Sequence, residues 1–204
     1  MGESRNLDPL RLLAYALAPR PVVLVVTLSA EGVLNIAPFS MVIPLSAEPP
    51  LLGVGISPRR DGGVKATLRN ILASGEFVVN TAGEVLLPAA VAASFDDGPP
   101  PPGRFETVSS EAVRPPRVLG APAQLECRLA EVFRPRGSET SLVVGEVVRL
   151  HFGDTLLPNE TGSPAEALPG HLAMEAPGIH WFRVGGRLLR VTAEGGDPAA
   201  RRKG

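Results

Sequence analysis

The sequence predicts a mostly β protein with flanking helices, in the form of a closed or partly closed antiparallel barrel. Two observations carry this prediction: strand-like segments outnumber helical ones, and hairpin turns separate several of them. The chain has 204 residues, of which 44% are hydrophobic, so it has material for one substantial core rather than for two full domains. We therefore expect a single domain over residues 1–191 and a flexible tail over 192–204.

The N-terminal part predicts a helix followed by a β-hairpin. Residues 7–17 carry leucines at helical spacing, with Asp8 as the candidate cap and Pro9 at the first helical position. Residues 22–27 are an almost continuous β-branched run. After the turn at 29–32 the chain returns through 33–39, so these two segments form the expected hairpin.

The next part predicts a strand, a helix and a second strand. Residues 50–57 are apolar with glycines at which a sheet bends, and a polar loop follows. Residues 64–73 have apolar side chains at helical spacing, and Ser74-Gly75 ends this helix. Residues 76–81 have the pattern of the second strand.

The remaining part predicts one more helix and two long strands. Residues 85–93 are expected to form a helix that starts near Pro88. Residues 96–103 contain consecutive prolines and predict an exposed loop. The segments that complete the chain are strands over 120–135 and 141–152, a loop with a short helix over 153–178, and a mixed segment over 179–191.

Composition excludes several classes of function. The formal net charge of −1 gives no positive field for nucleic acid. No apolar run has the length of a membrane span, and no signal-peptide region opens the chain, so we expect a cytoplasmic protein.

Cys127 lies in an alternating segment and is expected to be a core thiol. The histidines have no metal-ligand spacing, so no metal site is predicted. Frequent arginine and a single glutamine are typical of a GC-rich bacterial genome.

Residues 65–70 and the loop before them are the candidates for binding a phosphate. Lys65 supplies a cation, Thr67 a hydroxyl and Asn70 an amide, and the start of a helix offers unpaired N–H groups with a partial positive charge. Arg59 lies just upstream. The alternative is a basic helix face in solvent.

Residues 35–40 are the candidates for holding a planar ring. Such a ring needs an apolar face and donors along its polar edge, and strand N–H groups beside small side chains supply them. For Phe39 alone, core packing is the alternative. The candidates here are Asn35, Ala37, Pro38, Phe39 and Ser40, joined by Arg20, Thr27 and Ser57 at neighbouring strand or loop ends.

The order and spacing of 19–27, 35–40 and 65–70 resemble the flavin reductase-like family, the FMN-binding split barrels. The resemblance runs from about Ala18 to about His151. It implies a Greek-key split β-barrel that binds FMN, or alternatively FAD, with a Lys-x-Thr-x-x-Asn segment near the phosphate. The chain departs from the family pattern at Ala66, where relatives commonly carry an acid, and at residues 188–189, where they carry a tyrosine.

The resemblance also implies a homodimer with FMN near the subunit interface. A flavin reductase of this kind takes a hydride from NAD(P)H and passes electrons to oxygen, to a free flavin or to a partner oxygenase. The flavin supplies the chemistry, so no catalytic side chain is assigned. The alternatives are a non-catalytic, flavoredoxin-like electron carrier and a structural dimer with an empty pocket.

Overall fold

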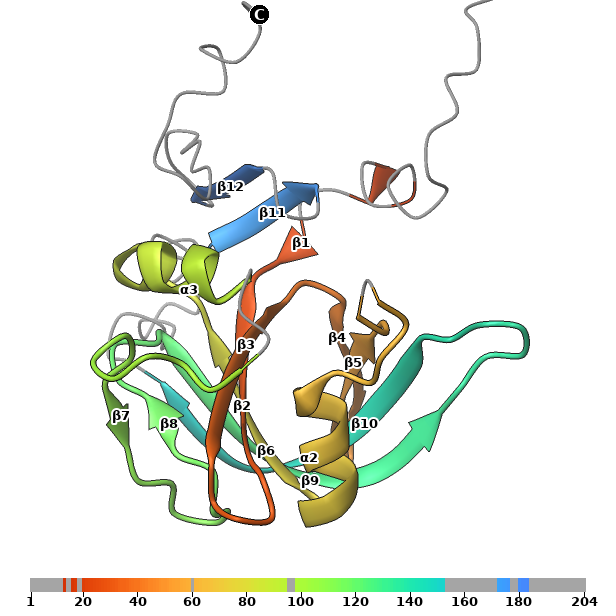
Figure 1. Cartoon of the computed structure of the whole chain (residues 1–204). Helices are drawn as coiled ribbons and strands as arrows, with labels where there is room; N and C mark the ends of the chain where they lie inside the picture. The colour runs from red at the N-terminus through yellow and green to blue at the C-terminus, as the bar shows by residue number, and fades with distance from the viewer. Residues whose placement is uncertain are drawn as a thin grey trace, which may run out of the picture.

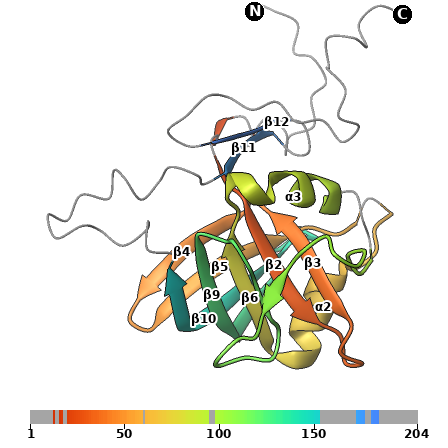
Figure 2. The same ribbon diagram turned by 90° about the vertical axis from the view of Figure 1, so that its left-hand side faces the viewer.

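A computed structural model describes Leu13 and residues 16–17, 20–59, 61–94 and 98–152, together with the backbone of 172–176 and 180–183. Its main body is a seven-stranded antiparallel sheet with the order β3-β2-β6-β9-β10-β5-β4, which curls around helix α2 (Ala66–Ser74) (Figure 1; Figure 2). The strands of this sheet are β2 (Val23–Leu28), β3 (Leu34–Phe39), β4 (Val42–Ala47), β5 (Pro50–Ile56), β6 (Glu76–Thr81), β9 (Ala123–Phe133) and β10 (Ser141–Phe152). The predicted mostly β fold with flanking helices is confirmed.

Shorter strands complete the fold. β1 (Arg20–Pro21), β11 (Leu172–Ala176) and β12 (His180–Arg183) form a three-stranded sheet, and β7 (Thr107–Val108) pairs with β8 (Arg117–Val118). The prediction of a loop and short helix over 153–178 is wrong at β11. This segment is extended because it pairs with β1, which lies far from it in sequence, and with β12, which follows it after a short connection.

β4 is a strand that the sequence does not predict. Pro44 lies inside it, and a proline cannot donate to a sheet ladder. β4 pairs with β5 alone and forms one edge of the large sheet, so its other side needs no N–H donor.

The helices agree with the predictions where they are described. In the predicted 9–17 helix, Leu13 and Ala16 are helical and the Leu17 N–H donates to the Leu13 carbonyl at 3.0 Å; the rest lies outside the described residues, as does the 192–204 tail. A 3₁₀ turn, η1 (Glu84–Leu86), leads into α3 (Leu87–Ala93), which has proline in its first turn. None of the described helices combines the length and apolarity that crossing a membrane would require.

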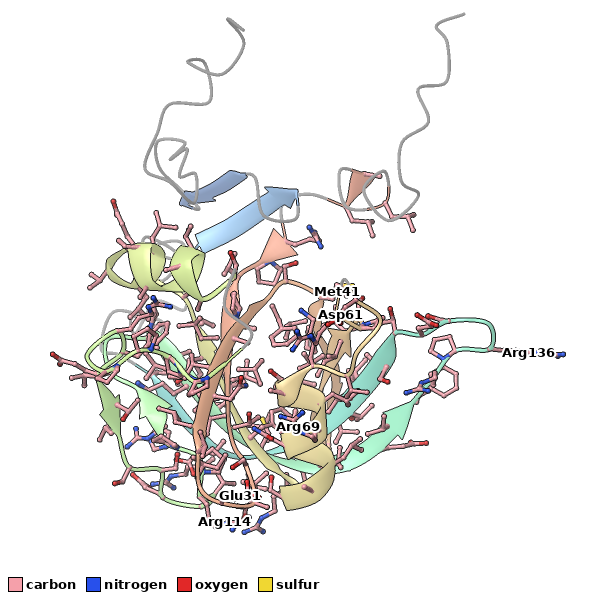
Figure 3. The ribbon with its side chains drawn as sticks, viewed as in Figure 1. Glu31, Met41, Asp61, Arg69, Arg114 and Arg136 are labelled. Carbon is pink, nitrogen blue, oxygen red and sulfur yellow. The ribbon has the colours of Figure 1, made fainter. Side chains whose placement is uncertain are left out.

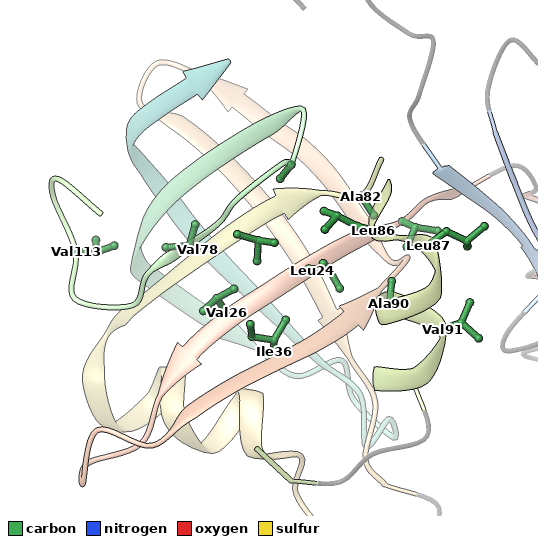
Figure 4. Packing of buried hydrophobic residues seen from close by; sticks show 13 residues of the cluster. Leu24, Val26, Ile36, Val78, Ala82, Leu86, Leu87, Ala90, Val91 and Val113 are labelled. Atoms are coloured by element: carbon green, nitrogen blue, oxygen red, sulfur yellow. The ribbon is translucent and has the colours of Figure 1, made fainter. Parts of the chain in front are cut away.

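The sheet separates two apolar clusters. On one face, Leu24 and Val26 of β2 pack with Val91 of α3 (Figure 4). On the other face, Val23 and Val25 pack with Leu68 and Ile71 of α2. β2 is thus buried on both faces, which explains why its sequence is continuously apolar rather than alternating.

Gly145 and Cys127 show how closely this second cluster is packed. A Cβ at Gly145 would overlap the ring of the fully buried Phe77 and lie 3.3 Å from the Cβ of Cys127. The predicted core position of Cys127 is confirmed. Burial raises the pKa of its thiol far above the ordinary value, so it stays protonated and unreactive.

Candidate functional site

A pocket of about 100 Å³ opens between β3, the start of α2 and the end of α3. Its lining includes Asn35, Ala37, Pro38, Lys65, Ala66, Thr67, Ala93 and Ser94. The structure therefore brings together five of the candidates, which come from two segments about 30 residues apart. Ala93 and Ser94 were missed because only tertiary packing places the end of α3 beside β3.

The N-terminus of α2 forms one wall of this pocket and has no side-chain cap. Lys65 is the N-cap residue, with extended backbone (φ −62°, ψ 142°), and no acidic residue lies in the first turn. The first helical hydrogen bond runs from the Arg69 N–H to the Lys65 carbonyl at 3.1 Å. The N–H groups of Ala66, Thr67 and Leu68 have no acceptor within the helix. This end of α2 therefore favours an anion.

Four buried polar side chains fix the position of α2 against the sheet. The Asn35 Nδ2 donates to Thr27 Oγ1 at 3.1 Å and to Thr67 Oγ1 at 3.0 Å. The Asn70 Nδ2 donates to Thr27 Oγ1 at 3.1 Å. All four side chains are at most 8% exposed. Thr27 and Asn70 do not line the pocket; they hold β2, β3 and the helix start in register.

Lys65 extends over an aromatic ring. Its Nζ lies 5.8 Å from the centroid of the Phe39 ring, within the range of a cation–π contact. Phe39 is 8% exposed and belongs to the cluster beneath α2, as its core-packing alternative predicted. The ring thus forms a fixed base beneath a cation that lines the pocket.

The remaining candidates lie outside the pocket lining. The Ser57 hydroxyl is 3.0 Å from that of Thr140, and an Arg59 Nη lies 3.2 Å from the Asp61 carboxylate. Ser40 is buried beyond the end of β3. Arg20 lies in β1, and its Nε and one Nη are buried without a hydrogen-bond partner.

The electrostatics of the pocket suit a phosphate. Among the described residues that line it, Lys65 is the charged one and none is a carboxylate, and the uncapped N–H groups of α2 are available as donors. Small side chains at Ala37, Ala66 and Ala93 leave the strand and helix backbone accessible. Among the described residues, no group of three or more His, Cys, Asp or Glu side chains could hold a metal ion.

Fold and site together define a split barrel with a pocket whose electrostatics suit an anionic small molecule, beside the edge strand β3. The model of the family described as "Flavin reductase like domain" matches residues 15–169, so the chain belongs to this family. The uncharacterized protein BH2278 of Halalkalibacterium halodurans is 37% identical over 78% of this chain and 79% of its own length.

Solved structures agree with this assignment. Nitrilotriacetate monooxygenase component B from Bacillus cereus has a TM-score of 0.77 at 29% identity, over 92% of this chain and 95% of its own. The FMN-binding protein from Thermus thermophilus, solved with 1-cyclohex-2-enone, has a TM-score of 0.71 at 25% identity, over 97% and 100%. Structural neighbours include both flavin reductases and flavoredoxins.

Proposed function

We propose that this protein is an FMN-dependent oxidoreductase that takes a hydride from NAD(P)H and passes electrons to oxygen, to a free flavin or to a partner oxygenase. The observation that carries the proposal is the uncapped N-terminus of α2, which faces a pocket beside β3 in a member of the flavin reductase-like family. FMN fits this arrangement because it joins one phosphate to one planar ring.

The residues present fit FMN at its phosphate end. The N–H groups of Ala66 and Thr67 would donate to the phosphate, and the Lys65 ammonium would balance its charge. The β3 backbone beside Ala37 and Pro38 would support the ring, since the described side chains that line the pocket there are small. The flavin supplies hydride acceptance from a reduced nicotinamide, and the protein binds and orients it.

The size of the pocket supports a homodimer. Sites that enclose a ligand of this kind measure roughly 300–1,000 Å³, whereas this pocket measures about 100 Å³. One subunit therefore encloses only part of FMN. We propose that a second copy covers the rest.

A non-catalytic FMN carrier is the second candidate. Flavoredoxins among the structural neighbours share this fold, and a carrier needs the same binding contacts to the cofactor as a reductase. Steady-state oxidation of NADH and of NADPH with added FMN separates the two. Turnover with either donor supports the reductase; flavin binding without turnover with either donor supports the carrier.

Two substitutions test whether the start of α2 binds the phosphate of FMN. Lys65→Ala removes the cation. Ala66→Pro removes one N–H donor at the first helical position, where proline fits and where the extended Lys65 is compatible with a following proline. Each should weaken FMN binding by about 1–3 kcal/mol, as for a lost charge-assisted hydrogen bond. Isothermal titration calorimetry measures the effect.

Two controls make this test specific. Ala66→Ser keeps the N–H and should bind FMN like the wild type. Riboflavin lacks the phosphate, so its affinity should be the same in all variants. FMN affinity that is unchanged in both Lys65→Ala and Ala66→Pro would place the phosphate elsewhere. A parallel titration with FAD tests the alternative cofactor.

A further inference from the structure

A histidine lies between two carboxylates where the β7–β8 loop (residues 109–116) meets the large sheet. His151, near the end of β10, has its Nε2 2.7 Å from Glu126 Oε1 and its Nδ1 3.9 Å from Glu111 Oε1. Glu126 belongs to β9 and is fully buried, whereas Glu111 belongs to the loop and its side chain is 51% exposed. The imidazole ring therefore lies between a fixed carboxylate of the sheet and a carboxylate of the loop.

The contact with Glu126 determines which ring nitrogen of His151 carries the proton when the imidazole is neutral. The Glu126 carboxylate accepts N–H groups of the loop, which favours its ionised form, and an ionised carboxylate can only accept hydrogen bonds. The Nε2 at 2.7 Å is therefore the donor. Nδ1 of the neutral ring then carries a lone pair and cannot donate to Glu111. Protonation adds an N–H at Nδ1 and a positive charge, and both attract the Glu111 carboxylate.

Arginines contact the same two carboxylates. The Arg149 Nη2 lies 2.7 Å from Glu111 Oε2, the oxygen that does not face the imidazole. The Arg117 Nε lies 3.7 Å from Glu126 Oε1. These two positive charges balance the two carboxylates, so protonation of the ring gives the cluster a net positive charge. Other charged groups that contact the loop or each other beside it are Arg114, Arg128 and Glu76.

The β7–β8 loop closes one side of the apolar core. Val113 is 9% exposed and belongs to the buried cluster on the α3 side of β2. The Glu111 and Ala112 N–H groups donate to the Glu126 carboxylate at 2.9 and 2.6 Å and hold the loop in this position. When these contacts open, the core beneath the loop becomes accessible to water.

We propose that His151 makes the attachment of the β7–β8 loop sensitive to pH, with the protonated ring bridging Glu126 of the sheet and Glu111 of the loop. At about pH 5.5 the ring donates from both nitrogens and the loop is held more tightly. At about pH 8 the neutral ring donates to Glu126, while Arg149 still contacts Glu111. Histidine is the side chain type that ordinarily gains and loses its charge in this range.

Amide hydrogen exchange of the full-length protein, followed by NMR, tests this inference. The protection factor of the Ala112 N–H corrects for the pH dependence of intrinsic exchange and measures how often the loop leaves Glu126. It should be about two- to fivefold higher at about pH 5.5 than at about pH 8, the range for an ion pair with an exposed partner. The Gly75 N–H, which donates to the Ile71 carbonyl at the end of α2, is the control for local opening elsewhere and should not show this change.

Two variants assign the effect to the proposed bridge. His151→Gln has an N–H donor for Glu126 but cannot gain a charge, so its Ala112 protection should be the same at both pH values. Glu111→Gln keeps His151 and removes the loop carboxylate, so the pH dependence should again be lost. Glu139→Gln, at an exposed position between β9 and β10, is the matched control and should behave like the wild type.

Three outcomes would overturn the inference. The first is equal Ala112 protection of the wild type at both pH values. The second is a pH dependence that persists in His151→Gln, since another group would then titrate. The third is one that persists in Glu111→Gln, since the ring would then act without the loop carboxylate; this comparison decides alone if His151→Gln does not fold. None of these measurements involves flavin, so their outcome is independent of the proposed function.

Discussion

The carboxylate of Glu126 is fully buried and is held by groups from several segments of the chain. The Glu111 N–H donates to it at 2.9 Å, the Ala112 N–H donates at 2.6 Å, and His151 Nε2 lies 2.7 Å from it. An Arg117 nitrogen lies 3.7 Å away. This one side chain therefore anchors the loop between β7 and β8 to the sheet.

These contacts reverse the effect that burial alone would have on the pKa of Glu126. Burial raises this pKa, but the two backbone N–H donors and His151 lower it further than burial raises it, so it lies below its ordinary value. The unfolded-state value is about 4.3. Glu126 therefore contributes its stabilisation above that pH, and the contribution is lost as the pH falls through the lower folded-state pKa.

We expect Glu126→Gln to lower the free energy of unfolding at pH 7 by roughly 1–3 kcal/mol, because the loop N–H groups lose their charged acceptor. Below about pH 4 the difference from the wild type should narrow, since the wild-type carboxylate then becomes protonated. Urea unfolding across this pH range measures both effects. Glu131→Gln, at an exposed position of the same strand, is the control and should change little. A difference that does not vary with pH would contradict the ionised state of Glu126.

At the scale of the element, α2 serves both the core and the site. Leu68 and Ile71 anchor it in the apolar cluster, while Thr67 and Asn70 bind it to polar groups of the sheet. Its C-cap is Gly75, which has a φ of 70° and donates its N–H to the Ile71 carbonyl at 2.8 Å. These contacts hold the uncapped N-terminus of α2 in place at the pocket wall. The helix can be found in Figure 3 by its labelled residue Arg69.

Thr67→Val tests how much the polar contacts of α2 contribute. Valine has a similar shape but no hydroxyl, so the Asn35 amide would lose one of its two buried acceptors. We expect a loss of about 1–3 kcal/mol in stability and weaker FMN binding, because the helix start would no longer be fixed. Thermal unfolding and calorimetry measure the two effects. Thr67→Ser keeps the hydroxyl and should stay close to the wild type. Equal behaviour of both variants would show that the hydroxyl has no role.

At the scale of the whole molecule, the large sheet ends in an apolar edge strand that pairs with no further strand of the described residues. β4 forms this edge, and its Ile43 and Leu45 side chains are 51% and 43% exposed. An open edge strand with exposed apolar side chains is a suitable surface for another chain. This surface supports the proposed homodimer.

We expect the wild type to be a dimer and Leu45→Glu to weaken the dimer by roughly 2 kcal/mol or more, as at an interface hot spot. FMN affinity should fall together with dimerisation, because the second subunit is proposed to complete the site. Sedimentation equilibrium with and without FMN measures both. Leu119→Glu is a matched control: Leu119 is 51% exposed and follows β8, which lies on the opposite side of the barrel from β4 (Figure 1). A monomeric wild type with full FMN affinity would contradict the proposed dimer.

Local patterns were sufficient for most elements that lie within one run of sequence. The 76–81 and 141–152 strands have the predicted bounds, and α2 ends at Ser74-Gly75 as predicted. These predictions succeed because side-chain alternation, helical spacing and a glycine C-cap are short-range properties. β4 was not predicted because Pro44 lies inside it and disguises a strand that pairs only with the neighbouring β5, and β11 was not predicted because it pairs with β1, which is distant in sequence.

The candidate site likewise combines features that short-range sequence patterns predict with features that depend on tertiary contacts. The sequence by itself determined that Lys65, Ala66 and Thr67 begin a helix and that Asn35, Ala37 and Pro38 lie on a strand, because backbone preference and periodicity act over a few residues. Only the tertiary structure decided that these two segments share a pocket with the end of α3. It also placed Thr27 and Asn70 where they hold β2, β3 and the helix start in register. The physical reason is that burial and hydrogen-bond satisfaction depend on neighbours that are distant in sequence, and the curled sheet alone brings those neighbours together.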